Sequence, residues 1–144
     1  MKQLVVFSAL LASAFVIAAA EPEPATYVGH DKVAELFTKG GAVAKSGDFT
    51  ASVASRTAAG QVEVHEKETD IFYITSGEAT FVTGGTMVGG KLSRPAQWLG
   101  TEIQGGVTHT LTKGDIITIP AGTPHWFKEV KTPVFYYMVK VIHP

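Results

Sequence analysis

Short runs of alternating polar and apolar residues, or of β-branched and aromatic residues, follow one another along the chain from residue 49 onward. Glycine, proline and serine interrupt these runs about every ten residues, a spacing that predicts an all-β sandwich or a closed barrel. The predicted strands are residues 49–54, 61–65, 71–75, 79–83, 87–88, 107–111, 116–119, 125–130 and 134–142.

One helix is predicted ahead of these strands, from Asp31 to about Lys39. Aspartate is a favourable residue at a helix N-terminus. Three apolar residues fall on one face at helical spacing, and two glycines follow directly and end the helix.

Two segments lack a regular pattern. Residues 21–26 contain prolines, which have no backbone N–H donor, so an extended arm is predicted there. Residues 91–106 show no clear period and are predicted to form a loop between two halves of the β-domain. The predicted organisation is an arm with a short helix over residues 21–48 and one β-domain over residues 49–144.

The first twenty residues have the features of a cleavable export signal. Lys2 gives a positive start, residues 4–17 are almost wholly apolar, and three alanines precede Glu21. An uncleaved membrane anchor is the alternative, but the apolar run is shorter than the roughly 20 residues that a span needs. Cleavage after Ala20 is therefore predicted, giving a periplasmic or secreted chain without a stable membrane span.

Length, charge and composition exclude several classes of partner and of catalytic site. The 144 residues suffice for one domain with a sizeable core, and the formal net charge is −1. No basic run is present that could neutralise phosphates, so no nucleic-acid partner is expected. The chain has no cysteine, which excludes disulfides, thiolate metal ligands and a catalytic cysteine. A serine nucleophile elbow is also absent from the sequence.

The segment from Gly114 to His125 carries the strongest signal. Its order is Gly, five residues, Pro, one residue, Gly, two residues, His. Gly114 allows a tight turn into strand 116–119, and Pro120 with Gly122 form the turn that follows. His125 then begins the returning strand, where its imidazole can point into a barrel.

This order resembles the second of the two motifs of the cupin family. The first cupin motif runs Gly, five residues, His-x-His, three or four residues, Glu, six residues, Gly. Counting back from Gly77 places Asp70 at the Glu position and His65 at the second His position. Glu63 takes the first His position, and Gly60 lies near the opening Gly position. The first motif is thus a variant.

The resemblance covers about residues 50–142. It implies a single cupin β-barrel of the jelly-roll type, as in small single-domain cupins. It also implies a divalent transition metal, a small-molecule ligand or substrate, and a homodimer. Cupins include dioxygenases, isomerases, epimerases, lyases, storage proteins and sugar-binding regulators, so the resemblance does not fix the reaction.

By this resemblance the metal ligands would be Glu63, His65, Asp70 and His125. Residues 63 and 65 lie two apart on one strand and therefore face the same side. Two imidazoles and two carboxylates suit manganese, iron, nickel or zinc. Aspartate is one methylene shorter than glutamate, so Asp70 would bind weakly or only through water. The alternative is a metal-free barrel in which Glu63 and Asp70 are polar pocket residues or an outward-facing pair.

Strand 61–65 allows two orientations. Alternation alone favours Val62 and Val64 facing the core, whereas the two motifs together favour Glu63 and His65 facing the interior. In the second orientation another apolar layer must cover the valines. The helix, the N-terminal arm or a partner subunit could supply that layer.

Apolar residues next to the predicted ligands would line the pocket. Phe72 and Ile74 share the face of Asp70 and would form an apolar wall. Phe127 faces inward by parity with His125.

Two polar residues are further pocket candidates. Arg56 could hold a substrate carboxylate, although a surface position is the commoner role. His109 could act as an acid or base at the pocket mouth, although a plain strand histidine is commoner.

The sequence therefore predicts an exported, metal-dependent cupin enzyme of the dioxygenase, isomerase or lyase type. Its substrate would be a small oxygen-rich organic molecule, with a carbonyl polarised or oxygens bound by the ion. The alternatives are a non-catalytic cupin that binds a small ligand or metal, and a metal-free structural dimer.

Overall fold

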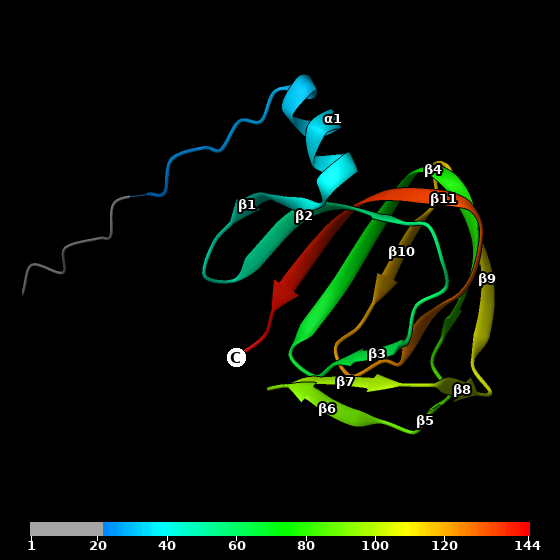
Figure 1. Cartoon of the computed structure of the whole chain (residues 1–144). Helices are drawn as coiled ribbons and strands as arrows, with labels where there is room; N and C mark the ends of the chain where they lie inside the picture. Colours follow the sequence, from blue (N-terminus) through cyan, green and yellow to red (C-terminus); the bar gives the residue numbers. More distant parts are fainter. Residues whose placement is uncertain (1–21) are drawn as a thin grey trace, which may run out of the picture.

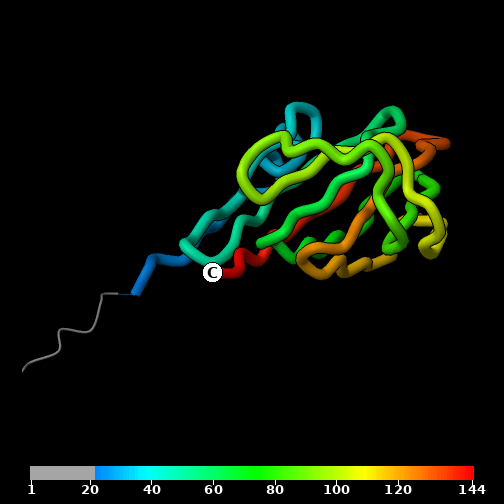
Figure 2. Tube along the Cα trace, turned by 90° about the horizontal axis from the view of Figure 1, so that it is seen from below, coloured from blue at the N-terminus to red at the C-terminus, as the bar shows by residue number. Residues whose placement is uncertain are grey.

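Antiparallel strands make up most of the computed structural model, which describes residues 22–144 (Figure 1). The predicted export signal, residues 1–20, lies outside the described residues. Residues 22–29 form an extended arm that projects away from the barrel (Figure 2). Among residues 22–144, no helix has the length and apolar character that crossing a membrane requires.

The helix α1 (His30–Lys39) is followed only by strands. These strands are β1 (Gly41–Lys45), β2 (Phe49–Arg56), β3 (Val62–His65), β4 (Glu68–Thr83), β5 (Thr86–Val88), β6 (Lys91–Arg94), β7 (Gln97–Gly100), β8 (Glu102–Gln104), β9 (Val107–Thr112), β10 (Ile116–Ile119) and β11 (His125–Ile142). The predicted all-β fold with a short N-terminal helix is confirmed.

The two longest strands, β4 and β11, form the frame of the barrel. They pair antiparallel along most of their length, from Thr83 opposite His125 to Glu68 opposite Ile142. Several register shifts interrupt this ladder between Phe127 and Tyr136. Such irregularities bend strands, and the two strands curve together around the barrel interior (Figure 1).

The other strands extend this pair on both sides. β2 pairs with β11 and β1 pairs with β2, while β9 and β10 pair with β4. β3 joins the beginning of β11 and continues through β7 to β6, and β5 and β8 form a separate two-stranded sheet. Because β1 belongs to the sheet, the β-domain begins at Gly41 rather than at the predicted residue 49.

A cluster of aromatic rings fills the core between β4 and β11. Phe81 and Phe127 meet edge to face with ring centroids 4.6 Å apart. Phe72 and Tyr136 are 4.9 Å apart, and Ile74 is fully buried beside them. Such aromatic pairs contribute about 0.5–1.5 kcal/mol each beyond the burial of area. Three of these rings also border the candidate site, so the core positions that site.

In β3, Glu63 faces the interior of the barrel and Val62 faces outward, as the two motifs predict. Val62 is fully buried in a second cluster with Val82 and Ile103. Met87 and Trp126 pack against that cluster. The expectation that the helix, the arm or a partner subunit covers this valine is wrong. The small β5–β8 sheet, which carries Met87 and Ile103, supplies much of the covering layer.

The helix α1 packs on the outside of the barrel, against β2 (Figure 1). It begins one residue before the predicted start, with Gly29 as its N-cap. Asp31 lies in the first turn, where a negative charge is favourable. Phe37 from its apolar face meets Phe135 of β11 edge to face at 6.0 Å. The expected homodimer stays a prediction, which light scattering of the protein in solution tests.

The segment 91–106 is more regular than predicted. It contains β6, β7 and β8, and β7 pairs with all of β3, from Val62 opposite Gly100 to His65 opposite Gln97. The pattern did not show these strands because each has only three or four residues, too few to display a period. All of β6 is also exposed to solvent, so no apolar face marks it.

Gly77 and Gly114 offer a matched test of packing in the barrel. Both are in the left-handed region, with φ of 90° and 97°. A Cβ at Gly77 would clash with the Pro133 carbonyl oxygen and lie 2.7 Å from the Val134 Cα. A Cβ at Gly114 would meet nothing within 4 Å.

We expect Gly114→Ala to lower the free energy of unfolding by about 1–2 kcal/mol, because alanine must adopt the left-handed backbone conformation. Gly77→Ala adds overpacking, so it should cost about 1–3 kcal/mol more. Urea unfolding of the two variants measures the difference. Equal losses of stability would contradict the close approach at Gly77.

Candidate metal centre

The second motif positions His125 through a turn that is attached to the first motif. Thr123 N–H donates to the Pro120 carbonyl over 3.1 Å and closes the turn. Gly122 N–H donates to the backbone carbonyl of His65 over 2.7 Å. A backbone hydrogen bond therefore holds the two histidine-bearing segments together.

The imidazole of His125 is fixed in one orientation. Its Nδ1 lies 3.0 Å from the carbonyl oxygen of Thr123. A carbonyl only accepts, so Nδ1 carries the proton and donates, and Nε2 is left free for the cavity. Burial lowers the pKa of His125, which keeps the ring neutral near pH 7. Neutral imidazole is the form that binds metals.

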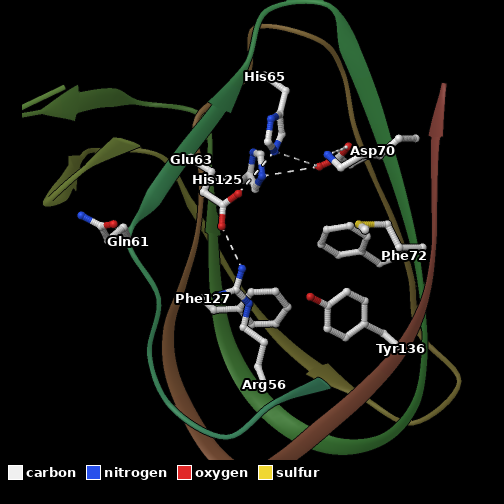
Figure 3. A pocket seen from close by; sticks show the side chains of 11 residues that line it. Arg56, Gln61, Glu63, His65, Asp70, Phe72, His125, Phe127 and Tyr136 are labelled. Atoms are coloured by element: carbon white, nitrogen blue, oxygen red, sulfur yellow. Dashed lines mark hydrogen bonds and ion pairs between the residues drawn. The ribbon is translucent and has the colours of Figure 1, made fainter. Parts of the chain in front are cut away.

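β3 and the start of β4 supply the other polar side chains of the cluster (Figure 3). His125 is the cross-strand partner of Glu63. His65 Nε2 lies 3.3 Å from Oε2 of Glu63 and 3.6 Å from Oδ2 of Asp70. His125 Nε2 is also 3.6 Å from Oδ2 of Asp70. The structure thus brings together the four residues predicted as ligands.

The spacing of these donor atoms suits a divalent ion. Donors about 2.1 Å from a tetrahedral ion lie about 3.4 Å from one another, close to the 3.3 and 3.6 Å that separate these donor atoms. Donor atoms of Glu63, His65 and His125 all lie within 4.8 Å of one another, and His65, Glu68 and Asp70 form a second such group. The described residues therefore contain side chains that can hold a metal ion.

Each carboxylate of the cluster is shared between a cation and the histidines. Arg56 donates to Oε1 of Glu63 over 2.8 Å, so Oε2 is left for His65. Lys140 donates to Oδ1 of Asp70 over 2.7 Å, so Oδ2 is left for the histidines. Buried carboxylates need such partners, because an uncompensated buried charge is strongly destabilising.

A third carboxylate, Glu68, completes a ring of polar contacts around His65. Its Oε2 lies 3.0 Å from Nζ of Lys140 and 3.4 Å from Nδ1 of His65. His65 Nδ1 and Glu68 Oε2 are both buried and make no hydrogen bond of good geometry. A small movement would join them. Such a bond would hold the proton on Nδ1 and leave Nε2 for a metal.

The charges around the cluster keep Glu63 and Glu68 ionised. Burial alone would raise the pKa of Glu63, but the hydrogen bond with His65 and the charge of Arg56 outweigh it and lower the pKa to about 2. Burial would also raise the pKa of Glu68, but its contact with Lys140 lowers that pKa overall. Both groups are therefore anionic at neutral pH.

The cluster closes one end of a cavity of about 110 Å³ (Figure 3). Three residues predicted to line the pocket, Arg56, Phe72 and Phe127, lie in its wall. Arg56 stands over the Phe127 ring, 5.2 Å from its centroid. The full lining is Arg56, Gln61, Glu63, His65, Asp70, Phe72, His125, Phe127, Tyr136, Met138 and Lys140.

Two residues predicted to line the pocket lie elsewhere. Ile74 shares the face of Phe72 but is fully buried in the aromatic core, one step farther from the cluster. His109 Nε2 is hydrogen-bonded to the Thr83 hydroxyl over 2.9 Å, and His109 borders a separate open depression. Strand parity identified the correct face for Ile74, but parity gives no position along the strand.

The contribution of the last strand was missed by sequence reasoning. Tyr136, Met138 and Lys140 alternate along β11 and all line the cavity. Their alternation was the available signal. It was obscured because the opposite face of the same strand is also largely apolar, with Tyr137 and Val139.

We compared the sequence of this barrel protein with known protein families. The sequence matches the cupin family over residues 18–143. The chain therefore belongs to the cupin family, and the resemblance in the two motifs is confirmed. No curated protein sequence matches the chain significantly.

Solved structures of low sequence identity share this fold. BH2720 from Bacillus halodurans has a TM-score of 0.58 at 16% identity, over 84% of this chain and 86% of that chain. The Cnp3 cupin domain of Schizosaccharomyces pombe has a TM-score of 0.52 at 17% identity, over 72% and 59%. TT1209 from Thermus thermophilus has a TM-score of 0.50 at 20% identity, over 72% and 81%. At these identities the likeness concerns the fold alone.

We expect the metal-free protein to lose stability in acid through Glu63. Its pKa of about 2 in the folded protein lies below its ordinary value of 4.5. The stabilisation is therefore complete above the ordinary pKa, amounts to about 3 kcal/mol, and is lost as the pH falls toward 2. About 2 kcal/mol of it should be gone by pH 3.

Urea unfolding at pH 6 and pH 3 measures this loss, with Glu63→Gln as the reference without the titrating group. The wild-type protein should lose about 2 kcal/mol more than this variant between the two pH values. The same pH dependence in both proteins would show that Glu63 has no lowered pKa.

Proposed function

We propose that this protein is a metal-dependent enzyme that acts on a small, oxygen-rich organic molecule. One observation carries the proposal: four donor side chains converge at one end of a cavity, and the apolar side chains Phe72, Phe127 and Met138 form part of its wall. A cavity with a few convergent polar groups is the usual form of a small-molecule site. The proposed ligands are Glu63, His65, Asp70 and His125.

The residues around the cluster have separate roles in this proposal. A bound ion would supply Lewis acidity, polarising a carbonyl or binding substrate oxygens. Arg56 and Lys140 hold the outer oxygen of each carboxylate and so orient the inner one. Phe72, Phe127 and Met138 form a wall that excludes water from one side of the substrate.

The donor set narrows the choice of ion. Two imidazoles with two carboxylates suit manganese, iron, nickel or zinc. A carboxylate at Glu63, where the family motif has histidine, adds negative charge and favours the harder ions of this group.

The ion pairs of the cluster favour one alternative, a metal-free barrel that binds a small ligand without catalysis. Arg56 and Lys140 already compensate Glu63 and Asp70 without any metal. Metal analysis separates the two proposals. If metal is bound, a screen of oxygenase, lyase and isomerase substrates then separates an enzyme from a binding protein.

Replacement of His125 by alanine should abolish stoichiometric metal binding. The change removes one of the two imidazoles of the proposed site, while His109→Ala removes an imidazole outside the cavity and should leave binding unchanged. Plasma mass spectrometry of untagged, metal-loaded protein measures the content.

Two outcomes count against the proposal. Less than about a tenth of an equivalent of any transition ion in the wild-type protein would exclude a metalloenzyme. Metal retained by His125→Ala would show that the ligand assignment is wrong.

We also propose that the chain is exported and that residues 1–20 are removed. The apolar run of residues 4–17 and the three alanines before Glu21 support this proposal. Mass spectrometry of the protein from the periplasm or medium of an expressing bacterium should give Glu21 as the first residue. A chain that keeps Met1 would contradict it.

A further inference from the structure

The charge of the site depends on whether an ion is bound. Glu63, Asp70 and Glu68 supply three negative charges, and their ion-pair partners Arg56, Lys140 and Arg94 supply three positive charges. The charges of the bare site are therefore balanced. A divalent ion held by neutral imidazoles adds two positive charges in excess. In a buried site such an excess is only weakly screened by solvent.

Arg56 stands where a ligand can reach it. Its side chain is 31% exposed, lies over the Phe127 ring and borders the cavity. Glu63 accepts from Nη2, and a guanidinium fork has five N–H donors in all. A partly engaged guanidinium at the wall of a cavity is a site for a carboxylate.

The Tyr136 hydroxyl provides a second donor at the same end of the cavity. Burial raises the pKa of Tyr136, so the hydroxyl keeps its proton at neutral pH. Figure 3 shows Arg56 and Tyr136 together, away from His65 at the other end of the cluster. The cavity thus has two donors at one end and the proposed ion at the other.

We propose that the cavity takes a small carboxylate anion, and that it does so only after a divalent ion is bound. The carboxylate accepts hydrogen bonds from Arg56 and Tyr136, and the remainder of the molecule reaches toward the ion. This inference rests on the proposed function, because it requires the metal. The cavity of about 110 Å³ has room for several water molecules, which limits the ligand to a few heavy atoms.

A small neutral polyol is the main competitor for this cavity. Those of its hydroxyls that lie against Phe72, Phe127 and Met138 would find no hydrogen-bond partners of comparable strength. Burying unpaired hydroxyls is unfavourable. A small carboxylate confines its polar atoms to the ends of the cavity, where the donors and the ion are. Its binding also depends on the positive charge that the ion brings to the site, whereas that of a polyol does not.

Calorimetric titration with matched probes tests the inference. Acetate and malonate are compared with acetamide and malonamide, which have nearly the same shape without the charge. Each is titrated into protein without metal and into protein loaded with Mn²⁺, Fe²⁺, Ni²⁺ or Zn²⁺. We expect at least one carboxylate to bind the loaded protein tenfold or more tightly than its amide, and neither carboxylate to bind measurably without metal.

Variants locate the carboxylate. Arg56→Gln and Tyr136→Phe should each weaken carboxylate binding about tenfold at saturating metal, the cost of one lost charged hydrogen bond. Lys113→Gln removes an exposed cation that lies outside the cavity, and it should leave affinity unchanged. The Tyr136 hydroxyl is in contact with Arg56, which in turn holds Glu63. The metal content of Tyr136→Phe is therefore measured beside its carboxylate affinity, and it should stay unchanged.

The outcomes separate this inference from the proposed function. Failure of all four ions to bind overturns both. Metal binding with equal affinity for carboxylate and amide, or equal carboxylate affinity with and without metal, overturns the inference alone. Full affinity in Tyr136→Phe and Arg56→Gln overturns the assigned position of the carboxylate.

Discussion

The register of β11 is the constraint on which the site depends. In an antiparallel sheet, residues directly opposite one another are the closest side-chain neighbours. Near its start β11 places His125 opposite Glu63 of β3, and near its end it places Lys140 opposite Asp70 of β4. A slip of one residue would turn all these side chains to the other face. One strand therefore supplies both an imidazole and a cation to a cluster whose other members come from the first motif.

Electrostatic pairing explains how so polar a cluster can be buried beside an aromatic core. Glu63 and Asp70 each give one oxygen to a cation and turn the other toward histidine nitrogen. The cations lower the cost of burying negative charge, and they leave the inner oxygens available to an ion. The two departures from the family motif, at residues 63 and 70, thus occur together with two cations in the same cavity.

The sequence contained enough to predict the fold and the four members of the cluster, because both motifs have fixed spacing and strand parity assigns faces. The layer over Val62 could not be foreseen, since β5 and β8 have three residues each and show no period. The contact of Lys140 with Asp70 spans 70 positions in the sequence. It depends on a strand register that no local pattern contains. Ile74 was predicted to line the pocket but lies in the aromatic core. Strand parity shows which face a residue occupies, but it does not show how far along the strand the pocket extends.

Anomalous diffraction from crystals of this protein soaked in a manganese salt shows whether the four side chains bind an ion. We expect one dominant peak, bounded by Nε2 of His65 and His125 and by the inner carboxylate oxygens of Glu63 and Asp70. Arg56 and Lys140 should remain on the outer oxygens. No peak at this position, with both ion pairs unchanged and the ion elsewhere or absent, would contradict it.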